Sequence, residues 1–377
     1  MKTYRWFFLV LVTGMMVSCK GTSEEELIGD WQRRAFFRDT PRSHAATFVI
    51  GNKGYVCCGW STQKQRRNDV FEFDHRGGAG KGSWKEMNIF PGPRRSHAVG
   101  FSIGGFGYIG TGYGFDSDNE DIDMKDFWRY DPDNDEWTEV APMPEKARTR
   151  RGAIAFSLFV GGKEYGYVGF GLHDGPLDRL PLMDLWQFDP EGQTTGEDGE
   201  IYSGHWTEVE GYGGYKREGA AVFVIDNKAY ICNGKTSSTV NDFWLFDPNA
   251  ANSDDVWKSN PPRPMYDANP DEDYDDDYGG LGRSYGVAYV ASVSGQLRGH
   301  IVGGEKSSNW EYDHDNDLWI QRTQFYNYRS PNSRDGMVSF SFPNTGRAFA
   351  GMGRSGITPA DDMWEFIPLK EDFIYDD

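Results

Sequence analysis

The sequence has little cysteine, a deficit of positive charge and few long apolar segments, and each shortage excludes a class of protein. Four cysteines in 377 residues are too few for the disulfide framework that holds many small exported domains together. Lys and Arg number 39 against 58 Asp and Glu, and the net charge of −19 disfavours a nucleic-acid-binding role. The most apolar run, residues 6–17, is too short to span a bilayer.

That apolar run has the features of an export signal. Lys2 and Arg5 precede it, and Ser18 and Cys19 follow it, which is the order of a secretory signal peptide. The segment "MVSC" resembles a bacterial lipobox, and the resemblance implies cleavage before Cys19 and acylation of that cysteine. We therefore expect a signal peptide at residues 1–18 and a lipidated tether at 19–30; secretion without lipid and an uncleaved anchor are the alternatives.

The tether carries a second feature of exported lipoproteins. Its residues "KGTSEEE" resemble the acid-rich export tags of surface lipoproteins in Bacteroidetes-type bacteria. We expect an exported lipoprotein at the outer membrane, on its periplasmic or cell-surface side, that contacts the membrane through its lipid alone. The net charge of this mature chain would be −21, because Lys2 and Arg5 leave with the signal.

Aromatic residues, at 15%, and glycine, at 47 residues, are abundant, whereas helical patterns are few. This composition is typical of an all-β protein. Three landmarks recur in fixed order: an Arg-x-[small or His] motif, a stretch such as "YIGTG" that ends near glycine, and a variant of "DLWQFDP", followed in most copies by a Trp. The motif begins six times, at Arg42, Arg95, Arg150, Arg217, Arg283 and Arg334.

Successive motif arginines are 51 to 67 residues apart, which is the length of a propeller blade with loop insertions. With their glycines, aromatics and spaced tryptophans, the six copies resemble the kelch repeat over nearly all of Trp31 to Ile367. The resemblance implies an all-β, six-bladed kelch-type β-propeller at residues 31–368, like the central domain of galactose oxidase. An acidic C-terminal tail would follow at 369–377.

The two ends of the repeat region predict how the ring closes. Trp31 begins the fourth strand of a blade before any first strand, whereas "DMWEFI" near the C-terminus is a third strand with no Trp after it. We predict that the N-terminal strand at Trp31 pairs with the strand at Trp364 and completes the last blade. An open ring would leave strand edges exposed.

The six motif arginines should lie near one mouth of the propeller, where the loops at 60–68, 113–125, 172–183, 235–241, 305–308 and 354–361 also lie. Guanidinium groups recognise carboxylates and phosphates, so all six arginines are candidate ligand-binding residues. In the alternative interpretation each arginine pairs with a recurring aspartate and holds the blades together: Asp69, Asp126, Asp184, Asp242 or Asp362.

Three histidines are further candidate ligand-binding residues. His44 and His97 occupy equivalent positions in the first two copies, and His173 lies in a loop of the third. Three imidazoles at one mouth could hold a metal, but repeated histidines also pack or bond to backbone, and no copper motif of the galactose oxidase kind can be matched. We expect no resident metal and no cofactor. Cys57 and Cys232 are interpreted as small apolar fillers.

Two acidic segments, residues 116–126 and 267–278, are rich in oxygen ligands for a hard cation. Neither has the loop pattern of an EF-hand, and solvated acidic loops are the alternative interpretation. The sequence shows no Ser-His-Asp order, nucleotide-binding loop or zinc-type cysteine pattern. Catalysis therefore has no motif of its own here.

These observations favour binding over catalysis. We expect a monomeric, lipid-anchored interaction module that presents one propeller mouth to a glycan or protein ligand. The alternative is a sugar-modifying enzyme of the N-acetylneuraminate epimerase type, a class of exported six-bladed kelch propellers, with Glu218, Asp174 or Glu305 as acid–base groups. A copper-dependent carbohydrate oxidase is a more distant alternative. The fold alone does not decide among them.

Overall fold

The structure, a computed structural model, describes residues 27–62, 65–115, 118, 120–196, 199–264, 281–325 and 333–370. The signal peptide, Cys19, the tether up to residue 26, the acidic segment 267–278 and residues 371–377 of the tail lie outside the described residues. The helical elements of the described part are three 3-10 turns: η1 (Gly78–Gly80), η2 (Glu145–Ala147) and η3 (Ser253–Asp255). None of them is long and apolar enough to cross a bilayer.

Within the described residues, most strands belong to six four-stranded antiparallel sheets. Five of these sheets pair their strands in chain order. The first sheet contains β3 (Ala46–Ile50), β4 (Lys53–Cys57), β6 (Val70–Asp74) and β7 (Ser83–Met87), and the second contains β9 (Val99–Ile103), β10 (Phe106–Gly110), β13 (Phe127–Asp131) and β14 (Glu136–Val140). The third sheet contains β15 (Ile154–Val160), β16 (Lys163–Gly169), β19 (Leu185–Thr195) and β20 (Ile201–Val209), and the fourth contains β21 (Glu218–Ile225), β22 (Lys228–Lys235), β23 (Asp242–Phe246) and β24 (Trp257–Pro264). The fifth sheet contains β25 (Gly286–Val293), β26 (Gln296–Gly303), β27 (Asn309–Asp313) and β28 (Leu318–Arg322).

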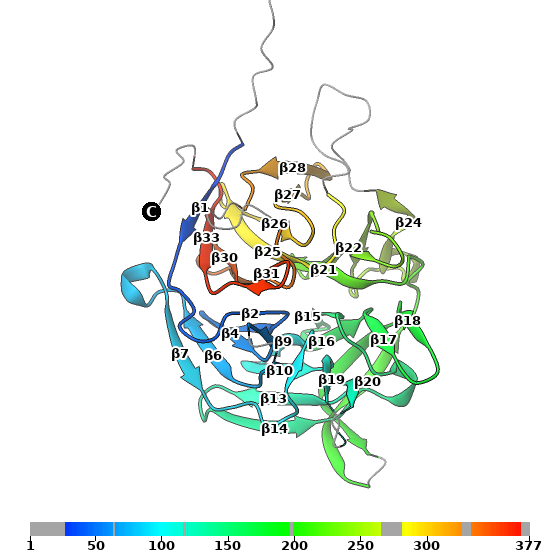
Figure 1. Cartoon of the computed structure of the whole chain (residues 1–377). Helices are drawn as coiled ribbons and strands as arrows, with labels where there is room; N and C mark the ends of the chain where they lie inside the picture. Colours follow the sequence, from blue (N-terminus) through cyan, green and yellow to red (C-terminus); the bar gives the residue numbers. More distant parts are fainter. Residues whose placement is uncertain are drawn as a thin grey trace, which may run out of the picture.

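The sixth sheet joins the two ends of the described chain. It consists of β29 (Val338–Phe342), β30 (Arg347–Gly351), β33 (Met363–Ile367) and β1 (Asp30–Arg33). β1 pairs antiparallel with β33, so that Trp31 lies opposite Phe366 and Arg33 opposite Trp364. Figure 1 shows the blue β1 beside the red β33. This is the pairing that the order of landmarks predicted.

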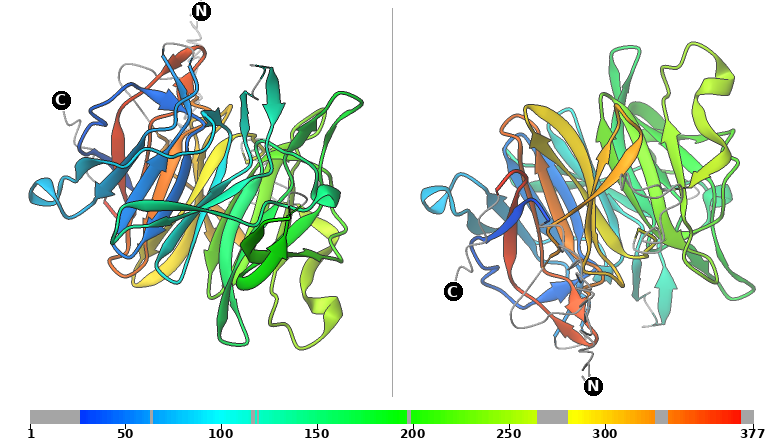
Figure 2. Two further views of the ribbon diagram at one scale, coloured as in Figure 1. Left: turned by 90° about the horizontal axis from the view of Figure 1, so that it is seen from below. Right: turned by 90° about the horizontal axis from the view of Figure 1, so that it is seen from above.

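The first strands of the six sheets surround a common centre. Each contacts the first strand of the next sheet, and the last of them, β29, contacts β3 of the first sheet. In the side views of Figure 2 the strands of successive sheets lie next to one another. The result is an all-β fold of small antiparallel sheets arranged as in a propeller.

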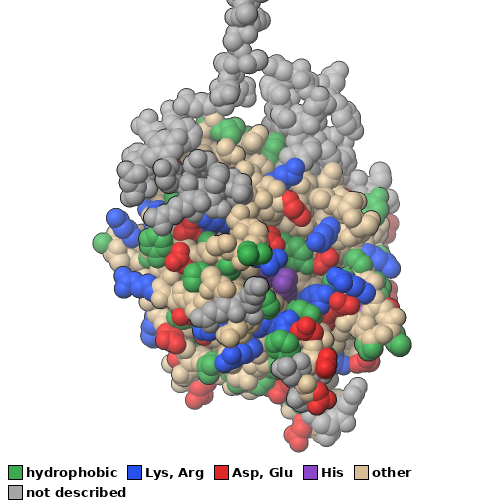
Figure 3. Space-filling view, viewed as in Figure 1, with side chains coloured by type: hydrophobic (Ala, Val, Ile, Leu, Met, Phe, Trp, Pro, Cys, Tyr) green, Lys and Arg blue, Asp and Glu red, His purple; other side chains and the backbone are tan. Residues whose placement is uncertain are grey.

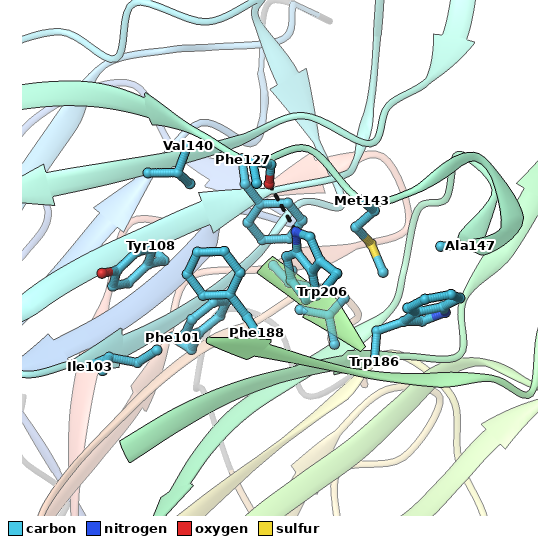
Figure 4. Packing of buried hydrophobic residues seen from close by; sticks show 13 residues of the cluster. Phe101, Ile103, Tyr108, Phe127, Val140, Met143, Ala147, Trp186, Phe188 and Trp206 are labelled. Atoms are coloured by element: carbon cyan, nitrogen blue, oxygen red, sulfur yellow. Dashed lines mark hydrogen bonds between the residues drawn. The ribbon is translucent and has the colours of Figure 1, made fainter. Parts of the chain in front are cut away.

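The core lies between neighbouring sheets, because strand alternation points large side chains at the next sheet. In Figure 4, Phe101 and Tyr108 of one sheet face Phe188 of the next, and the indole nitrogen of Trp206 donates to a backbone carbonyl. A glycine in four of the second strands makes room for an aromatic ring of the neighbouring sheet: Gly54, Gly107, Gly166 and Gly299. A Cβ at Gly166, for example, would lie 2.2 Å from the ring of Phe101.

Shorter strands hold the segments that enter and leave the sheets on one face. They form small sheets of two or three strands: β2 (Arg42–Ser43) with β5 (Trp60–Ser61); β8 (Arg95–Ser96) with β11 (Tyr113–Phe115) and β12 (Asp121–Asp123); β17 (Leu172–Asp174) with β18 (Arg179–Pro181); and β31 (Arg354–Ser355) with β32 (Thr358–Pro359). β2 and β8 contain motif arginines, so these strands fix the motifs against the loops of the same face.

Candidate functional site

The third residue of every Arg-x-x motif has the same left-handed backbone, with φ between 52° and 63°. The backbone N–H of each donates to the carbonyl of the previous one, at 2.8 to 3.0 Å, and the bond from the first residue to the last completes a cycle. We call this cycle the axial ring; its members are His44, His97, Gly152, Gly219, Tyr285 and Gly336. The ring links all six sheets at the centre of one face.

Three members of the axial ring carry large side chains although left-handed backbone favours glycine. The imidazoles of His44 and His97 stack with centroids 3.8 Å apart, and both meet the Tyr285 ring edge to face, at 5.4 and 5.6 Å. The glycines leave space for these rings: a Cβ at Gly336 would lie 2.5 Å from His44, and one at Gly219 would lie 2.9 Å from Tyr285. Three aromatic rings therefore occupy the centre.

A cavity of about 310 Å³ lies against these rings. Figure 3 shows a histidine near the centre of this face, with Lys and Arg side chains around it. We call the cavity the axial pocket; besides His44, His97 and Tyr285 it is lined by Lys235, Ser284, Gly304, Glu305, Ser333, Asp335, Arg354 and Gly356. Its lining combines aromatic faces with charges of both signs.

The charges of the axial pocket differ in how far the protein satisfies them. Asp335 accepts hydrogen bonds from Arg354 at 3.0 and 3.1 Å, and Glu305 accepts from the backbone N–H and the hydroxyl of Ser284. The ammonium of Lys235 lies 5.2 Å from the centre of the Tyr285 ring. Among the described residues no carboxylate forms an ion pair with Lys235. Lys235 is therefore a cation of the axial pocket whose ammonium could still form an ion pair with a bound anion.

The environment fixes the protonation of two parts of the axial pocket: its aromatic floor, formed by His44, His97 and Tyr285, and Glu305 in its wall. Burial, together with the charges of Arg354 and Lys235, lowers the pKa of His44 to about 3. Burial and the neighbouring His44 hold the pKa of His97 well below its usual value. Burial opposes ionisation of Glu305, but the hydrogen bonds from Ser284 outweigh it and keep the Glu305 pKa below normal. At neutral pH the floor is uncharged and Glu305 is a carboxylate.

The six motif arginines lie beneath this surface. None is more than 2% exposed. Each donates to the carbonyl of the left-handed residue at the end of a second strand, as Arg95 does to Thr111 at 3.0 Å. Five also form ion pairs with aspartate: Arg42–Asp69, Arg95–Asp126, Arg150–Asp184, Arg217–Asp242 and Arg334–Asp362. The geometry favours the interpretation that they hold the sheets together.

Arg283 is the exception among the six. It donates to the backbone carbonyl and hydroxyl of Ser308, at 2.7 and 2.9 Å, where the other copies have aspartate. Burial lowers the pKa of its guanidinium to about 10. The fifth sheet therefore keeps the arginine but places serine where the other copies have aspartate.

His173 lies away from the two stacked histidines, in a separate cavity of about 450 Å³ with Glu145, Lys146, Arg148 and Thr149. Its Nδ1 is 2.9 Å from the carbonyl of Thr149. The structure thus brings two of the three predicted histidines together. In the part of the chain that it describes, no cluster of His, Cys, Asp and Glu has the arrangement of a metal site.

The predicted acidic residues are also engaged. Glu218 accepts a hydrogen bond from the Tyr285 hydroxyl, and Asp174 accepts from Arg151 at 2.7 Å. In the acidic segment 116–126, Asp121 pairs with Arg66 at 2.7 Å and Asp123 with Arg151 at 2.8 Å, while residues 116, 117 and 119 lie outside the described part. These carboxylates therefore hold neighbouring loops of this face together.

Sequence reasoning missed Lys235, Tyr285, Asp335 and Arg354. A signal for them exists in the repeat itself. Asp335 and Tyr285 are second and third residues of the motif, and Lys235 and Arg354 each follow the glycine that comes after the left-handed residue of a second strand. These register positions vary among the six copies, so the search for recurring residues passed over them.

Comparisons with known proteins identify the repeat and the fold. A family model for the Kelch motif matches residues 113–144. A solved structure titled "Structure of YjhT" superposes with a TM-score of 0.64 at 15% identity, over 88% of this chain and 95% of that one. No curated protein sequence matches. Because 386 chains of solved structures match, the likeness establishes a widespread propeller fold rather than an activity.

Proposed function

We propose that the protein is an exported, lipid-anchored binding module that receives an acidic sugar unit of a glycan in its axial pocket. We further propose that its sheets are the six blades of a closed kelch propeller. The cycle of contacts among first strands, the axial ring and the β1–β33 pairing support the closed propeller. The "MVSC" segment and the acidic tether support the lipid anchor.

The observation that carries the proposed ligand is the unpaired ammonium of Lys235 beside an aromatic floor. A carboxylate on the ligand would receive charge-assisted hydrogen bonds from Lys235 and from the exposed side of Arg354. The faces of Tyr285 and the stacked histidines offer apolar contact to sugar C–H groups, and Asp335 and Glu305 offer acceptors to hydroxyls. A volume of about 310 Å³ suits one sugar unit better than an extended chain.

The same geometry weighs against the enzymatic alternative. An acid–base mechanism requires a group poised to exchange a proton with the substrate. Glu218 already accepts from Tyr285, Glu305 from Ser284 and Asp174 from Arg151. A polar pocket with one unused cation therefore supports recognition more directly than turnover.

Calorimetry and thermal shift on the mature chain, residues 19–377, test the proposal with N-acetylneuraminate and glucuronate as probes and neutral galactose as the reference. We expect an acidic sugar to bind and Lys235→Met to weaken it by roughly 10- to 100-fold, as the loss of a charge-assisted hydrogen bond does. Lys85→Met, at an exposed lysine of the outer strand β7, is the matched control. No binding of either acid, or equal affinity in both variants, would count against the proposal.

The anchor is tested separately by fractionation of cells that express the full chain. Cys19→Ala should move the protein from membranes to soluble fractions, because the lipid is the only proposed attachment. Persistent membrane association of that variant would contradict lipid anchoring. A third experiment tests the enzymatic alternative: NMR of N-acetylneuraminate incubated with the mature chain would show product if the protein were an enzyme.

A further inference from the structure

The second strand of the first sheet ends in two adjacent cysteines, Cys57 and Cys58. Their Sγ atoms lie 3.0 Å apart, and both residues are completely buried. The third described cysteine, Cys232, lies in the fourth sheet. The close contact of two neighbouring sulfurs is not what a strand ordinarily produces, since successive side chains of a strand point to opposite faces.

The backbone of Cys58 explains the contact. Its φ of 68° is left-handed, so β4 ends at Cys57 and the usual alternation of side chains stops there. The same left-handed residue ends the second strand in the other five sheets, where the corresponding pairs are Gly110–Thr111, Gly169–Phe170, Cys232–Asn233, Val302–Gly303 and Gly351–Met352. Only the first sheet combines this turn with cysteine at both positions.

We propose that Cys57 and Cys58 form a vicinal disulfide in the exported protein. The inference rests on the proposed export, because disulfides form and persist in oxidising compartments. The oxidant is a disulfide, carried by a thiol–disulfide oxidoreductase or a small molecule. One cysteine thiolate attacks it and releases a thiol; the second cysteine then attacks the mixed disulfide and releases the other. Two cysteine thiols lose two protons and two electrons, and the donor disulfide becomes two thiols.

Burial determines when this exchange takes place. Burial raises the pKa of the Cys57 thiol well above its usual value, so the folded protein offers little thiolate to an oxidant. The bond therefore forms while the first sheet is still open, and reductants cannot reach it afterwards. It fixes a turn whose carbonyl, at Cys58, accepts from Arg42 at 3.2 Å and whose N–H donates to the backbone of Asp69.

Peptide mass spectrometry tests the proposal on the full chain. The exported protein is denatured without reductant, alkylated with iodoacetamide and cut with trypsin, which places both cysteines in peptide 54–64 and Cys232 in peptide 229–235. We expect peptide 54–64 to carry no alkyl group and to lack two hydrogens, while peptide 229–235 carries one alkyl group. Two alkyl groups on peptide 54–64 from exported protein would overturn the proposal.

Two controls separate the bond from the export on which it rests. Cys58→Gly, which places at this turn the residue that the fifth sheet has at Gly303, should fold and yield one alkyl group on the peptide. The chain made without residues 1–18 in a reducing cytoplasm should yield two. Refolding that reduced chain with oxidised glutathione should restore the unalkylated peptide; if it does not, the bond is rejected whether or not export occurs.

Discussion

The first and the third residues of the same Arg-x-x motif perform opposite tasks. The first is arginine in all six copies and is at most 2% exposed, held by backbone carbonyls and, in five copies, by aspartate. The third varies among His, Gly and Tyr and forms the axial ring against the pocket. A repeat thus keeps one position constant for cohesion, whereas a neighbour two residues away varies and lines the axial pocket.

The comparison extends to charge. Buried arginines that face aspartate are neutralised pairs. Lys235 lies beside the Tyr285 ring and forms no ion pair with a carboxylate of the described residues, although its charge helps to lower the pKa of Glu305. Breaking a buried pair leaves an isolated charge in the core, and removing an unpaired surface cation leaves nothing behind. Stability should therefore depend on the first motif position, and affinity on the residues around the third.

The largest effect is expected from removing the strand that joins the chain ends. Deletion of residues 27–37 exposes the edge of β33 and removes Trp31, whose ring packs 5.0 Å from those of Phe325 and Phe366. We expect a loss above the roughly 3–5 kcal/mol that truncation of a buried Trp costs, seen as a sharply lower Tm by calorimetry. Deleting residues 20–26 is the control. A truncated domain that melts like the intact one would refute the closure.

The next effect should come from the arginine–aspartate pairs. Arg334→Ala leaves Asp362 buried without its partner and should lower the free energy of unfolding by about 3–5 kcal/mol. At the register where the other copies have aspartate, Arg283→Ala leaves the neutral hydroxyl of Ser308, so its cost should be smaller by about 1 kcal/mol or more. Urea unfolding of the two variants measures the difference. Equal costs would show that the aspartates contribute little to cohesion.

Sequence reasoning predicted the repeat, the strand order and the partner of Trp31 because these depend on local patterns that recur. It left two interpretations of the arginines open, since the recurrence of an arginine and an aspartate in each copy does not show whether the two side chains pair. It could not predict that His44, His97 and Tyr285 meet at one centre, with the two imidazoles stacked and the tyrosine ring edge to face with both. That arrangement depends on left-handed backbone at His44, His97 and Tyr285, although side chains with a Cβ disfavour this conformation. The hydrogen bonds of the axial ring impose the left-handed conformation at these residues.

The axial ring itself can be tested at its glycines. Gly336→Ala would place a Cβ 2.5 Å from His44 at a φ of 60°, whereas Gly51→Ala meets nothing at a φ of 58°. Both substitutions pay for left-handed backbone, and only the first crowds the ring. We expect Gly336→Ala to cost about 1–3 kcal/mol more than Gly51→Ala. Adding His44→Gly should recover most of the difference, and a failure to recover it would argue against the stack.

A smaller effect is expected from pH. The pKa of His44 is lowered from 6.5 to about 3 by burial, so between these values the unfolded chain binds a proton that the folded protein excludes. Stability contributed by neutral His44 is therefore complete above pH 6.5 and falls as the pH decreases, by about 2 kcal/mol at pH 5. His44→Asn should remove this contribution and so make the curve of unfolding free energy less steep in this window, while the slope contributed by His97 remains. Parallel curves for both proteins would contradict the burial of a neutral imidazole.

The most direct test of the division between cohesion and recognition measures Tm and sugar-acid affinity side by side for Arg334→Lys and Lys235→Met. Lysine cannot reproduce the two-pronged contact of Arg334 with Asp362, so the first variant should melt earlier and bind as tightly as the parent. The second should melt like the parent and bind roughly 10-fold more weakly or worse. A change of affinity in the arginine variant at unchanged Tm, or a change of Tm alone in the lysine variant, would contradict the account.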